Sequence, residues 1–203
     1  MDKTLETPLR ADAFDKTDEE KIDIIKNHFH QIMLTLGLDT TDDSLRNTPQ
    51  RVAKMYVKEL FSGLDPSRKP AATIFENNYD YDGILVEKNI TLTSVCEHHF
   101  MPMVGVAHVG YLSAGRVIGL SKINRIVNYF ARRPQVQERL TLQIADELKT
   151  ALGTEDVGVV IDSKHYCVVC RGIRDVNSST VTYSFHGKFN DPEVRKEFMN
   201  FLD

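Results

Sequence analysis

The chain contains few cysteines and no long apolar segment, and both absences narrow what it can be. Three cysteines occur among its 203 residues, an odd number in a chain too long to depend on disulfides for stability. We expect them to act as metal ligands or catalysts in the reducing environment of the cytoplasm. No apolar run is long enough to span a lipid bilayer, and residues 1–10 lack the apolar core of a secretory signal. We therefore expect no membrane association.

An excess of positive charge is also absent. The 25 lysines and arginines are outnumbered by 29 aspartates and glutamates, which gives a formal net charge of −4. Because general affinity for nucleic acids requires a basic surface, we expect no nucleic-acid partner. Any phosphate must then be bound by a local group of cations. Hydrophobic residues make up 41% of the chain, enough for the core of one large domain, with or without a smaller appendage.

The N-terminal third of the chain is predicted to be helical after a short arm. Residues 1–16 show no hydrophobic periodicity and are expected to form a mobile arm. A capping-box pattern at Thr17 starts a helix that ends at Gly37, and a second helix begins at Thr48. Residues 17–72 are therefore interpreted as a helical N-terminal part.

From residue 73 onward the pattern predicts a β-β-α-α-β-β core, with another strand at 180–185 before a short terminal helix. The expected elements are, in order, 84–96, 103–112, 121–133, 134–152, 157–161, 166–169, 180–185 and 191–198. Ser121 is expected to cap the first of the two central helices. This order predicts an α+β domain over residues 73–203, with an antiparallel β-sheet and two helices packed on one face.

Two short segments carry the residue types that bind transition metals. Cys96 and His99 are separated by two residues, a spacing that lets both side chains meet on one side of a turn. Cys167 is the best candidate for a third ligand, and two thiolates with one imidazole favour zinc. Three protein ligands leave one position for water, whose pKa zinc can lower to about 7. The remaining imidazoles, His98 and His165, would then lie beside the ion as proton donors or acceptors.

A closed structural metal site is the alternative. Cys167 and Cys170 have CxxC spacing, so Cys170 could complete a Cys₃His site with no open position. The two valines between them prefer extended backbone, however, whereas a zinc knuckle requires a tight turn. On a strand, His165 and Cys167 would face one side and Cys170 the other. We therefore favour the open site, with Cys170 as a small buried side chain.

A second group of residues could bind a phosphate. Lys122 and Arg125 share one face of the first turn of a predicted helix, where free backbone amides also favour an anion, and Ser121 precedes them. Arg171 would lie on the same strand face as Cys167. Each cation alone is better explained as part of a solvated surface. Together with the metal motif, they indicate a phosphate site.

Gln137 and Glu138 follow in the first turn of the next predicted helix. A carboxylate there is stabilised by the helix dipole, which would be a purely structural role. A carboxylate can also accept two parallel hydrogen bonds, and guanine offers such a pair through N1–H and its exocyclic amine. Gln137 and Glu138 are therefore a candidate site for a guanine base.

Taken together, these motifs resemble those of the GTP cyclohydrolase I family. The resemblance is carried by Ser94–Phe100, Ile118–Val127, Arg133–Leu140, His165–Cys167 with Arg171 and Gly172, and Thr48–Ala53. It covers most of the chain from residue 48 to the late 180s. No single segment is specific to that family, but the combination is.

The resemblance implies a tunnelling fold (T-fold), in which small sheets from several subunits join into a barrel. It also implies a homo-oligomer, a decamer of two stacked pentamers with active sites at subunit boundaries. This agrees with the general expectation that an exposed edge of an antiparallel sheet must be covered or paired.

The resemblance further implies roles for individual residues. Zinc would be bound by Cys96, His99 and Cys167, and His98 and His165 would form the acid–base pair. Guanine would be held by Glu138 and Gln137, and the triphosphate by Ser121, Lys122, Arg125, Arg171 and Arg51. The implied reaction is zinc-dependent hydrolytic opening of the imidazole ring of GTP, release of formate and rearrangement to 7,8-dihydroneopterin triphosphate. This is the first step of tetrahydrofolate and pterin biosynthesis.

Two other classes of protein share part of this pattern. A zinc nucleoside deaminase requires His-x-Glu and Pro-Cys-x-x-Cys, whereas here no proline precedes Cys167 and the upstream order is Cys96-Glu97-His98. A non-catalytic nucleotide-binding module would instead use Cys170 in a structural zinc site. Ammonia as a product would identify a deaminase, and formate a cyclohydrolase. Loss of the fold on metal removal would identify the module.

Overall fold

A five-stranded sheet with two long helices on one face forms the centre of the molecule, in a computed structural model that describes residues 6–202. In spatial order the strands are β5 (Pro134–Gln135), β2 (Leu85–Cys96), β3 (Pro102–Tyr111), β6 (Val157–His165) and β7 (Thr180–Phe185). All neighbours pair antiparallel except β5, which runs parallel to the end of β2. A separate two-stranded sheet joins β1 (Ile74–Glu76) to β4 (Arg116–Ile118). The predicted α+β class is confirmed.

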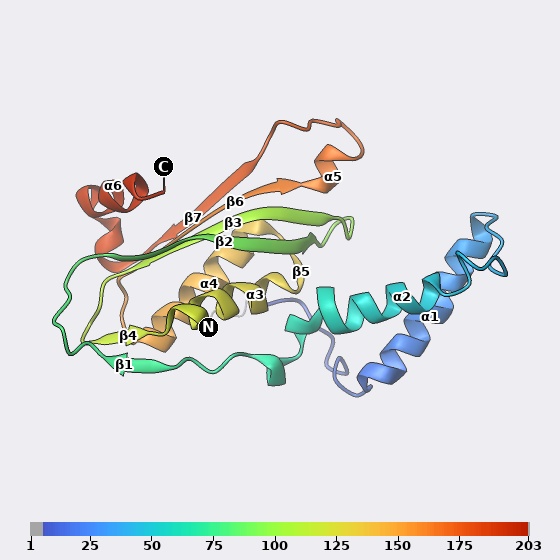
Figure 1. Cartoon of the computed structure of the whole chain (residues 1–203), viewed down its shortest axis with the longest axis horizontal. Helices are drawn as coiled ribbons and strands as arrows, with labels where there is room; N and C mark the ends of the chain where they lie inside the picture. Colours follow the sequence, from blue (N-terminus) through green and yellow to red (C-terminus); the bar gives the residue numbers. More distant parts are fainter. Residues whose placement is uncertain (1–5, 203) are drawn as a thin grey trace.

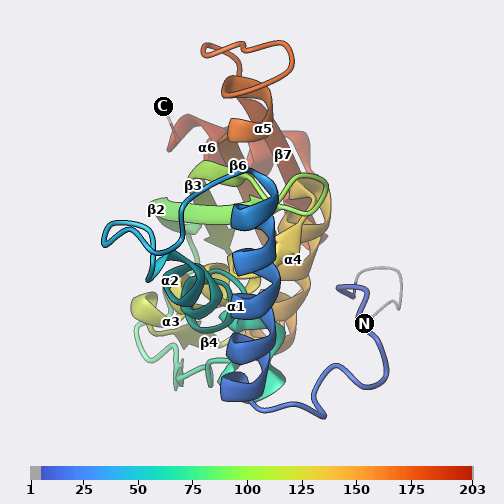
Figure 2. The same cartoon turned by 90° about the vertical axis from the view of Figure 1, so that its right-hand side faces the viewer.

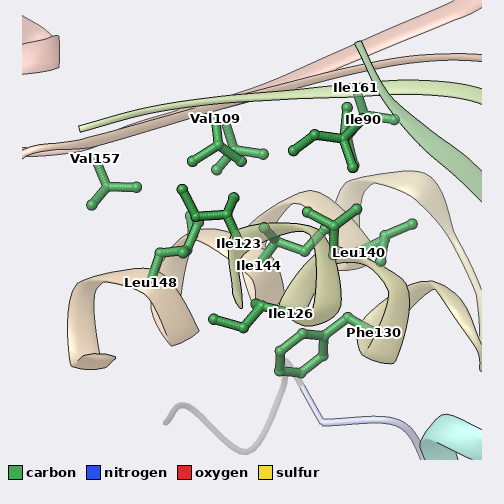
Figure 3. Close-up of a cluster of buried hydrophobic side chains, with 14 of the residues drawn as sticks. Ile90, Val109, Ile123, Ile126, Phe130, Leu140, Ile144, Leu148, Val157 and Ile161 are labelled. Carbon is green, nitrogen blue, oxygen red and sulfur yellow. The ribbon is translucent and has the colours of Figure 1, made fainter. Parts of the chain in front are cut away.

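Helices α3 (Leu120–Ala131) and α4 (Gln137–Leu152) cover one face of the sheet (Figure 1). Their apolar residues recur every three or four positions and point at alternate residues of the strands. Figure 3 shows this layer, with Ile123, Leu140, Ile144 and Leu148 of the helices on the side of Ile90, Val109, Val157 and Ile161 of the sheet. Ile126 and Phe130 of α3 belong to the same cluster and lie on the far side of the helices from the strands. All of them are buried. Truncating one such side chain costs about 2–5 kcal/mol, so this layer fixes both helices on the sheet.

The opposite face of the sheet is covered at one end by helix α6 (Pro192–Asn200) (Figure 1). The buried rings of Phe189 and Phe198 meet edge to face, with centroids 5.4 Å apart. They lie over Gly110 and Gly158, where an added Cβ would come within 2.7 Å and 2.6 Å of ring atoms. The rings occupy the space that side chains would need, which explains glycine at both positions.

Strand β7 forms one edge of the five-stranded sheet, and its outer side pairs with no other strand in residues 6–202. Val181 and Tyr183 on this strand are 56% and 66% exposed. Exposed sheet edges with apolar side chains are normally covered in the folded or assembled protein. We therefore expect the edge of β7 to pair with another segment or another chain.

Helices α1 (Asp18–Thr35) and α2 (Thr48–Lys54) pack against each other beyond one end of the sheet (Figures 1 and 2). The predicted capping box is present, since Thr17 Oγ1 accepts from Glu20 N–H and Glu20 accepts from Thr17 N–H. Helix α2 continues directly as one π-helical segment, Met55–Leu60. The two predicted N-terminal helices are thus confirmed.

The predicted arm of residues 1–16 falls partly outside the described residues, and its mobility stays a prediction. Leu9, Ala13 and Phe14 of this segment line a cavity of about 730 Å³, together with Tyr56 and other residues that follow α2. Within residues 6–202, no helix combines the length and the apolar character needed to cross a lipid bilayer.

The prediction that residues 166–169 form a strand is wrong. Strand β6 ends at His165, and the next four residues form the helical turn α5 (Tyr166–Val169). A 2.9 Å hydrogen bond from Cys170 N–H to Tyr166 O closes this turn. The strand preference of two adjacent valines is weak evidence in so short a segment, and the tertiary environment overrides it. The period-two argument built on that strand fails with it.

The two central helices also start differently from the prediction. The N-cap of α3 is Gly119, whose carbonyl accepts from Lys122 N–H at 2.7 Å, so Ser121 lies inside the first turn. Pro134 and Gln135 were expected to be helical but pair with the end of β2 instead. Proline restricts the residue before it and lacks an N–H, whereas its carbonyl can still join a strand at the sheet edge. Helix α4 therefore begins three residues later than expected, at Gln137.

Candidate active site

The predicted metal ligands lie together at one end of the sheet. The ligand atoms of Cys96, His99 and Cys167 are all within 4.8 Å of one another. Cys96 is the buried last residue of β2, His99 lies in the turn between β2 and β3, and Cys167 belongs to α5. Two sulfurs and one ring nitrogen this close together could hold a metal ion.

Backbone hydrogen bonds hold the turn that carries His98 and His99. Phe100 N–H donates to Cys96 O at 2.9 Å, and Cys96 N–H donates to Met101 O at 2.9 Å. Phe100 has a φ of 51°, in the left-handed region that few residues other than glycine adopt. Such a conformation persists where the surrounding contacts over-determine it. The turn therefore places His99 beside Cys96.

An ion pair ties the same turn to the helical layer. Glu97, between the ligands, pairs with Arg139 of α4, and Glu97 N–H donates to Gln135 O at 3.0 Å. Arg139 also donates to Pro134 O at 3.0 Å and to Gln135 Oε1 at 3.0 Å. The Glu97 and Arg139 side chains are 28% and 12% exposed, so solvent screens this pair less than a surface pair. The metal turn is thus anchored to β5 and α4.

Cys170 lies outside the ligand cluster. It follows the last residue of α5, where it is exposed, and the expectation of a small buried side chain is wrong because the helical turn directs it to the surface. Among residues 6–202, the group of close metal-binding atoms contains Cys96, His99 and Cys167 and not Cys170. This geometry agrees with an open three-ligand site rather than a closed Cys₃His site.

The thiol of Cys167 is expected to keep its proton until a metal ion binds. Burial raises its pKa, the neighbouring Cys96 adds to the shift, and the positive charge of Arg171 opposes it. Arg171 Nη1 also donates to His99 Nε2 at 3.1 Å. A thiol with a raised pKa keeps its proton near pH 7 until a cation displaces it. On the other side of the cluster, His98 Nδ1 lies 3.7 Å from Cys96 Sγ.

His165 and Glu138 lie next to the cluster. His165 is half-buried at the end of β6, and its Nε2 is 2.8 Å from Gln137 Oε1. Burial lowers the pKa of His165, and the negative charge of Glu138 opposes the shift. The imidazole is therefore neutral near pH 7. Glu138 is exposed in the first turn of α4, where the helix dipole stabilises its charge.

The predicted phosphate ligands on α3 lie towards the other end of the sheet. Asn124 of α3 donates to Glu87 Oε1 at 3.3 Å, near the start of β2. Cys96 follows Glu87 by nine positions (96 − 87). Nine strand residues at about 3.3 Å each span about 30 Å. Ser121 and Lys122, at the start of α3 beside β4, are thus remote from the metal cluster within one chain (Figure 1).

Two other predicted phosphate ligands have their contacts outside the cluster. Arg125 is exposed and lines a cavity of about 380 Å³ with Arg68 and Arg132. Arg51 donates to two oxygens near the start of its own helix, α2. Of the predicted phosphate ligands in the described residues, Arg171 is the one with a hydrogen bond to the cluster.

The family model of GTP cyclohydrolase I matches residues 25–203, which is most of the chain. The chain belongs to the GTP cyclohydrolase I family. The GTP cyclohydrolase 1 of Flavobacterium johnsoniae is 63% identical over 195 residues, covering 96% of this chain and 87% of that protein. The GTP cyclohydrolase 1 of Aeromonas salmonicida is 54% identical over 199 residues (98% and 90%), and that of Klebsiella pneumoniae 53% over 196 residues (96% and 88%). The predicted family is confirmed.

Among solved structures, that of the archaeosine synthase QueF-Like in its apo form is similar to 52% of this chain and 94% of its own. With a TM-score of 0.44 and 16% identity, this likeness is too distant to add to the argument. For this member of the GTP cyclohydrolase I family, one chain brings the metal ligands, both histidines and the guanine candidates to one place, whereas the α3 cations lie elsewhere.

Proposed function

We propose that this protein is an enzyme that hydrolyses GTP at the imidazole ring of its base. It releases formate and rearranges the remainder to 7,8-dihydroneopterin triphosphate, the first step of tetrahydrofolate and pterin biosynthesis. The observation that carries this proposal is the cluster of Cys96, His99 and Cys167 in a chain 63% identical to a GTP cyclohydrolase 1.

The chemistry of the donor set supports zinc as the bound ion. Cys96, His99 and Cys167 would hold it, because two thiolates and an imidazole suit zinc better than they suit a hard cation such as Mg²⁺. Bound zinc supplies a water molecule whose pKa is lowered to about 7. The other tasks, which are holding the base, holding the phosphates and moving protons, fall to side chains.

His165 and His98 are the residues proposed to move protons. A histidine that is neutral near pH 7 can accept a proton and return it within one reaction cycle. His165 meets this requirement because burial lowers its pKa, and His98 lies against Cys96. One of them delivers a proton to N7 of guanine as the ring opens. The exposed carboxylate of Glu138 accepts from N1–H and the exocyclic amine of the same base.

The triphosphate is proposed to be bound between two copies of the chain. Arg171 lies at the metal cluster, whereas Ser121 and Lys122, at the start of α3, lie towards the other end of a strand that spans about 30 Å. The α3 cations of a second copy would supply the missing contacts, with Arg51 as a further cation. This supports a homo-oligomer of the T-fold type, a decamer in which open sheet edges pair between subunits into a barrel.

The deciding experiment is incubation of the purified protein with GTP. We expect release of formate together with a pterin chromophore, loss of both with a zinc chelator, and recovery when Zn²⁺ is restored. Release of ammonia would instead indicate a deaminase. Absence of any product, with loss of the fold when the chelator removes the metal, would indicate a structural zinc module.

Two further predictions complete the proposal. The enzyme acts in the cytoplasm, where reducing conditions keep its three free cysteines as thiols. The catalytic domain comprises residues 73–203, preceded by the helical part of residues 17–72 and the arm of residues 1–16. Limited proteolysis near residue 72 would test that division, because a domain boundary is cleaved before a packed core.

A further inference from the structure

Gln137 was expected to bind guanine, but its side chain is directed into the protein. Gln137 is 1% exposed. Its Nε2 donates to Ile161 O at 3.1 Å and to Thr180 O at 2.8 Å. Its Oε1 accepts from Ser163 Oγ at 2.7 Å and lies 2.8 Å from His165 Nε2. Both ends of the amide are thus engaged by β6 and β7.

The two backbone carbonyls determine which way this amide points. A carbonyl oxygen only accepts hydrogen bonds, so the NH₂ group of Gln137 must face Ile161 O and Thr180 O. The reverse orientation would set the lone pairs of Oε1 against those of both carbonyl oxygens, an arrangement without any hydrogen bond to them. Oε1 is therefore fixed towards Ser163 and His165.

This orientation determines the tautomer of His165. An amide oxygen cannot donate, so the hydrogen bond requires a hydrogen on His165 Nε2. In a neutral imidazole the other nitrogen, Nδ1, is then an unprotonated acceptor. Nδ1 makes no hydrogen bond within the described part of the chain. It is thus the ring nitrogen that can take up and return a proton.

We propose that Gln137 is a positioning residue, whose amide fixes His165 as the Nε2–H tautomer and so leaves the lone pair of Nδ1 free to meet the substrate. The inference rests on the proposed function only in treating His165 as a proton-transfer group. It changes the expected role of Gln137, because an amide with both ends engaged has no free edge for a base. Glu138, exposed and adjacent, then binds guanine without the side chain of Gln137.

The most direct test requires no change to His165 or Gln137 in the protein being measured. Nitrogen NMR of the zinc-loaded protein, labelled with ¹⁵N in its histidine rings, distinguishes protonated from unprotonated ring nitrogens. Comparison with a His165→Asn sample assigns the signals. We expect a protonated Nε2 and an unprotonated Nδ1 at a pH where the ring is neutral. A protonated Nδ1 would overturn the proposal, whether or not the protein turns over GTP.

A variant without the amide tests its role in catalysis. Gln137→Leu removes the acceptor, so we expect both tautomers, unchanged zinc content and a kcat about a hundredfold lower, with KM for GTP changed less than about threefold. If Gln137→Leu instead raises KM strongly while kcat and the ring signals stay unchanged, Gln137 binds guanine and the proposal is wrong.

Thr141 offers a matched control one turn further along α4. It is 1% exposed, and its Oγ1 is 2.7 Å from Thr182 Oγ1 on β7. Thr141 Oγ1 also donates to Gln137 O at 2.8 Å. Thr141→Val therefore removes a backbone contact of Gln137 and a bond between helix and strand, but leaves the Gln137 amide and its contact with His165 in place. Its ring signals and kcat should match those of the unchanged protein, and a loss equal to that of Gln137→Leu would refute a specific role for the amide. If Gln137→Leu does not fold, the ring-nitrogen spectrum of the unchanged protein still decides.

Discussion

The two ends of the central sheet differ in how much of a site one chain completes. At the metal end, Cys96, His99 and Cys167 converge on a turn held by backbone hydrogen bonds and the Glu97–Arg139 ion pair. At the other end, the cations that begin α3 are partly or fully exposed and make no ion pair within residues 6–202. A metal ion is small enough to be enclosed by a single turn and strand end. A nucleotide is not, so its site depends on how copies of the chain assemble.

The largest effect is expected from removing a metal ligand. Cys167→Ala deletes one of the two thiols in the cluster, so zinc content and turnover of GTP should both fall to background. Metal analysis and formate release measure the two quantities. Cys170→Ala is the control and should leave both unchanged, because Cys170 is exposed and outside the cluster. Equal losses in the two variants would contradict the open site and support a closed Cys₃His site.

A smaller loss is expected at the other end of the sheet. Lys122→Ala should lower kcat/KM for GTP by about 10–100-fold, the value of one charge-assisted hydrogen bond to a phosphate. Its zinc content should stay unchanged because Lys122 is remote from the cluster. Steady-state kinetics with parallel metal analysis test both statements. A Lys122→Ala protein that loses zinc would mean that the two ends are not independent.

Oligomers that contain two different variants test whether the two ends of the sheet contribute to one site from separate subunits. Cys167→Ala and Lys122→Ala subunits, produced together, should show more activity than either variant has alone. If every site takes its metal half from one copy and its phosphate half from another, roughly a quarter of the sites in a random assembly are intact. No recovery above the sum of the separate variants would contradict sites shared between subunits.

The ion pair that anchors the metal turn should have an intermediate effect. Arg139→Met leaves Glu97 unpaired and removes the bonds to Pro134 and Gln135, so zinc affinity should fall about tenfold. Competition with a chelator of known affinity measures this change. Arg46→Met is the control, since Arg46 forms an exposed ion pair with Asp43 and should show no change. Unchanged affinity in Arg139→Met would show that backbone hydrogen bonds alone hold the turn.

The smallest effect is expected from a buried histidine in the middle of the sheet, on the pH dependence of the free energy of unfolding. His108 of β3 is 7% exposed, and burial lowers its pKa, with Lys88 adding to the shift and Asp162 opposing it. The unfolded chain binds the proton more readily, so the free energy of unfolding should fall as the pH drops below about 6.5. His108→Asn cannot be protonated and should lose less stability between about pH 7.5 and pH 5.5, by about 1 kcal/mol.

Thermal unfolding at the two pH values measures that difference. His28→Asn is a suitable control because His28 is exposed on α1, and its stability should decline with pH as in the unchanged protein. Equal declines for His108→Asn and the unchanged protein would show that the burial of His108 carries no proton linkage.

Long elements with regular spacing could be predicted from the sequence, and short ones could not. Leu140, Ile144 and Leu148 recur every fourth residue, which identifies α4 and its buried face. The helical turn α5 contains four residues, too few to show a period, and adjacent valines pointed to the wrong structure. The start of α4 was also misplaced, because a pairing with the end of β2 depends on tertiary contacts that local propensity does not contain.

The same distinction applies to the candidate site. The grouping of Cys96, His99 and Cys167 could be predicted because Cys96 and His99 are close in sequence and donor chemistry is specific, and their binding of a metal stays a prediction. The separation of Lys122 from Cys96 could not, since spacing along the chain contains no distance in space. Gln137 and Glu138 were assigned one role because they are adjacent. Neighbours on a helix point about 100° apart, however, so one is buried and the other exposed.

The open edge of β7 has a consequence for how the protein is made. A chain newly released from the ribosome presents unpaired backbone groups beside Val181 and Tyr183, and other unfinished chains can pair with them. Correct assembly and aggregation therefore compete for the same exposed edge of β7. High-level expression at low temperature, with slower synthesis, should favour the soluble product over inclusion bodies.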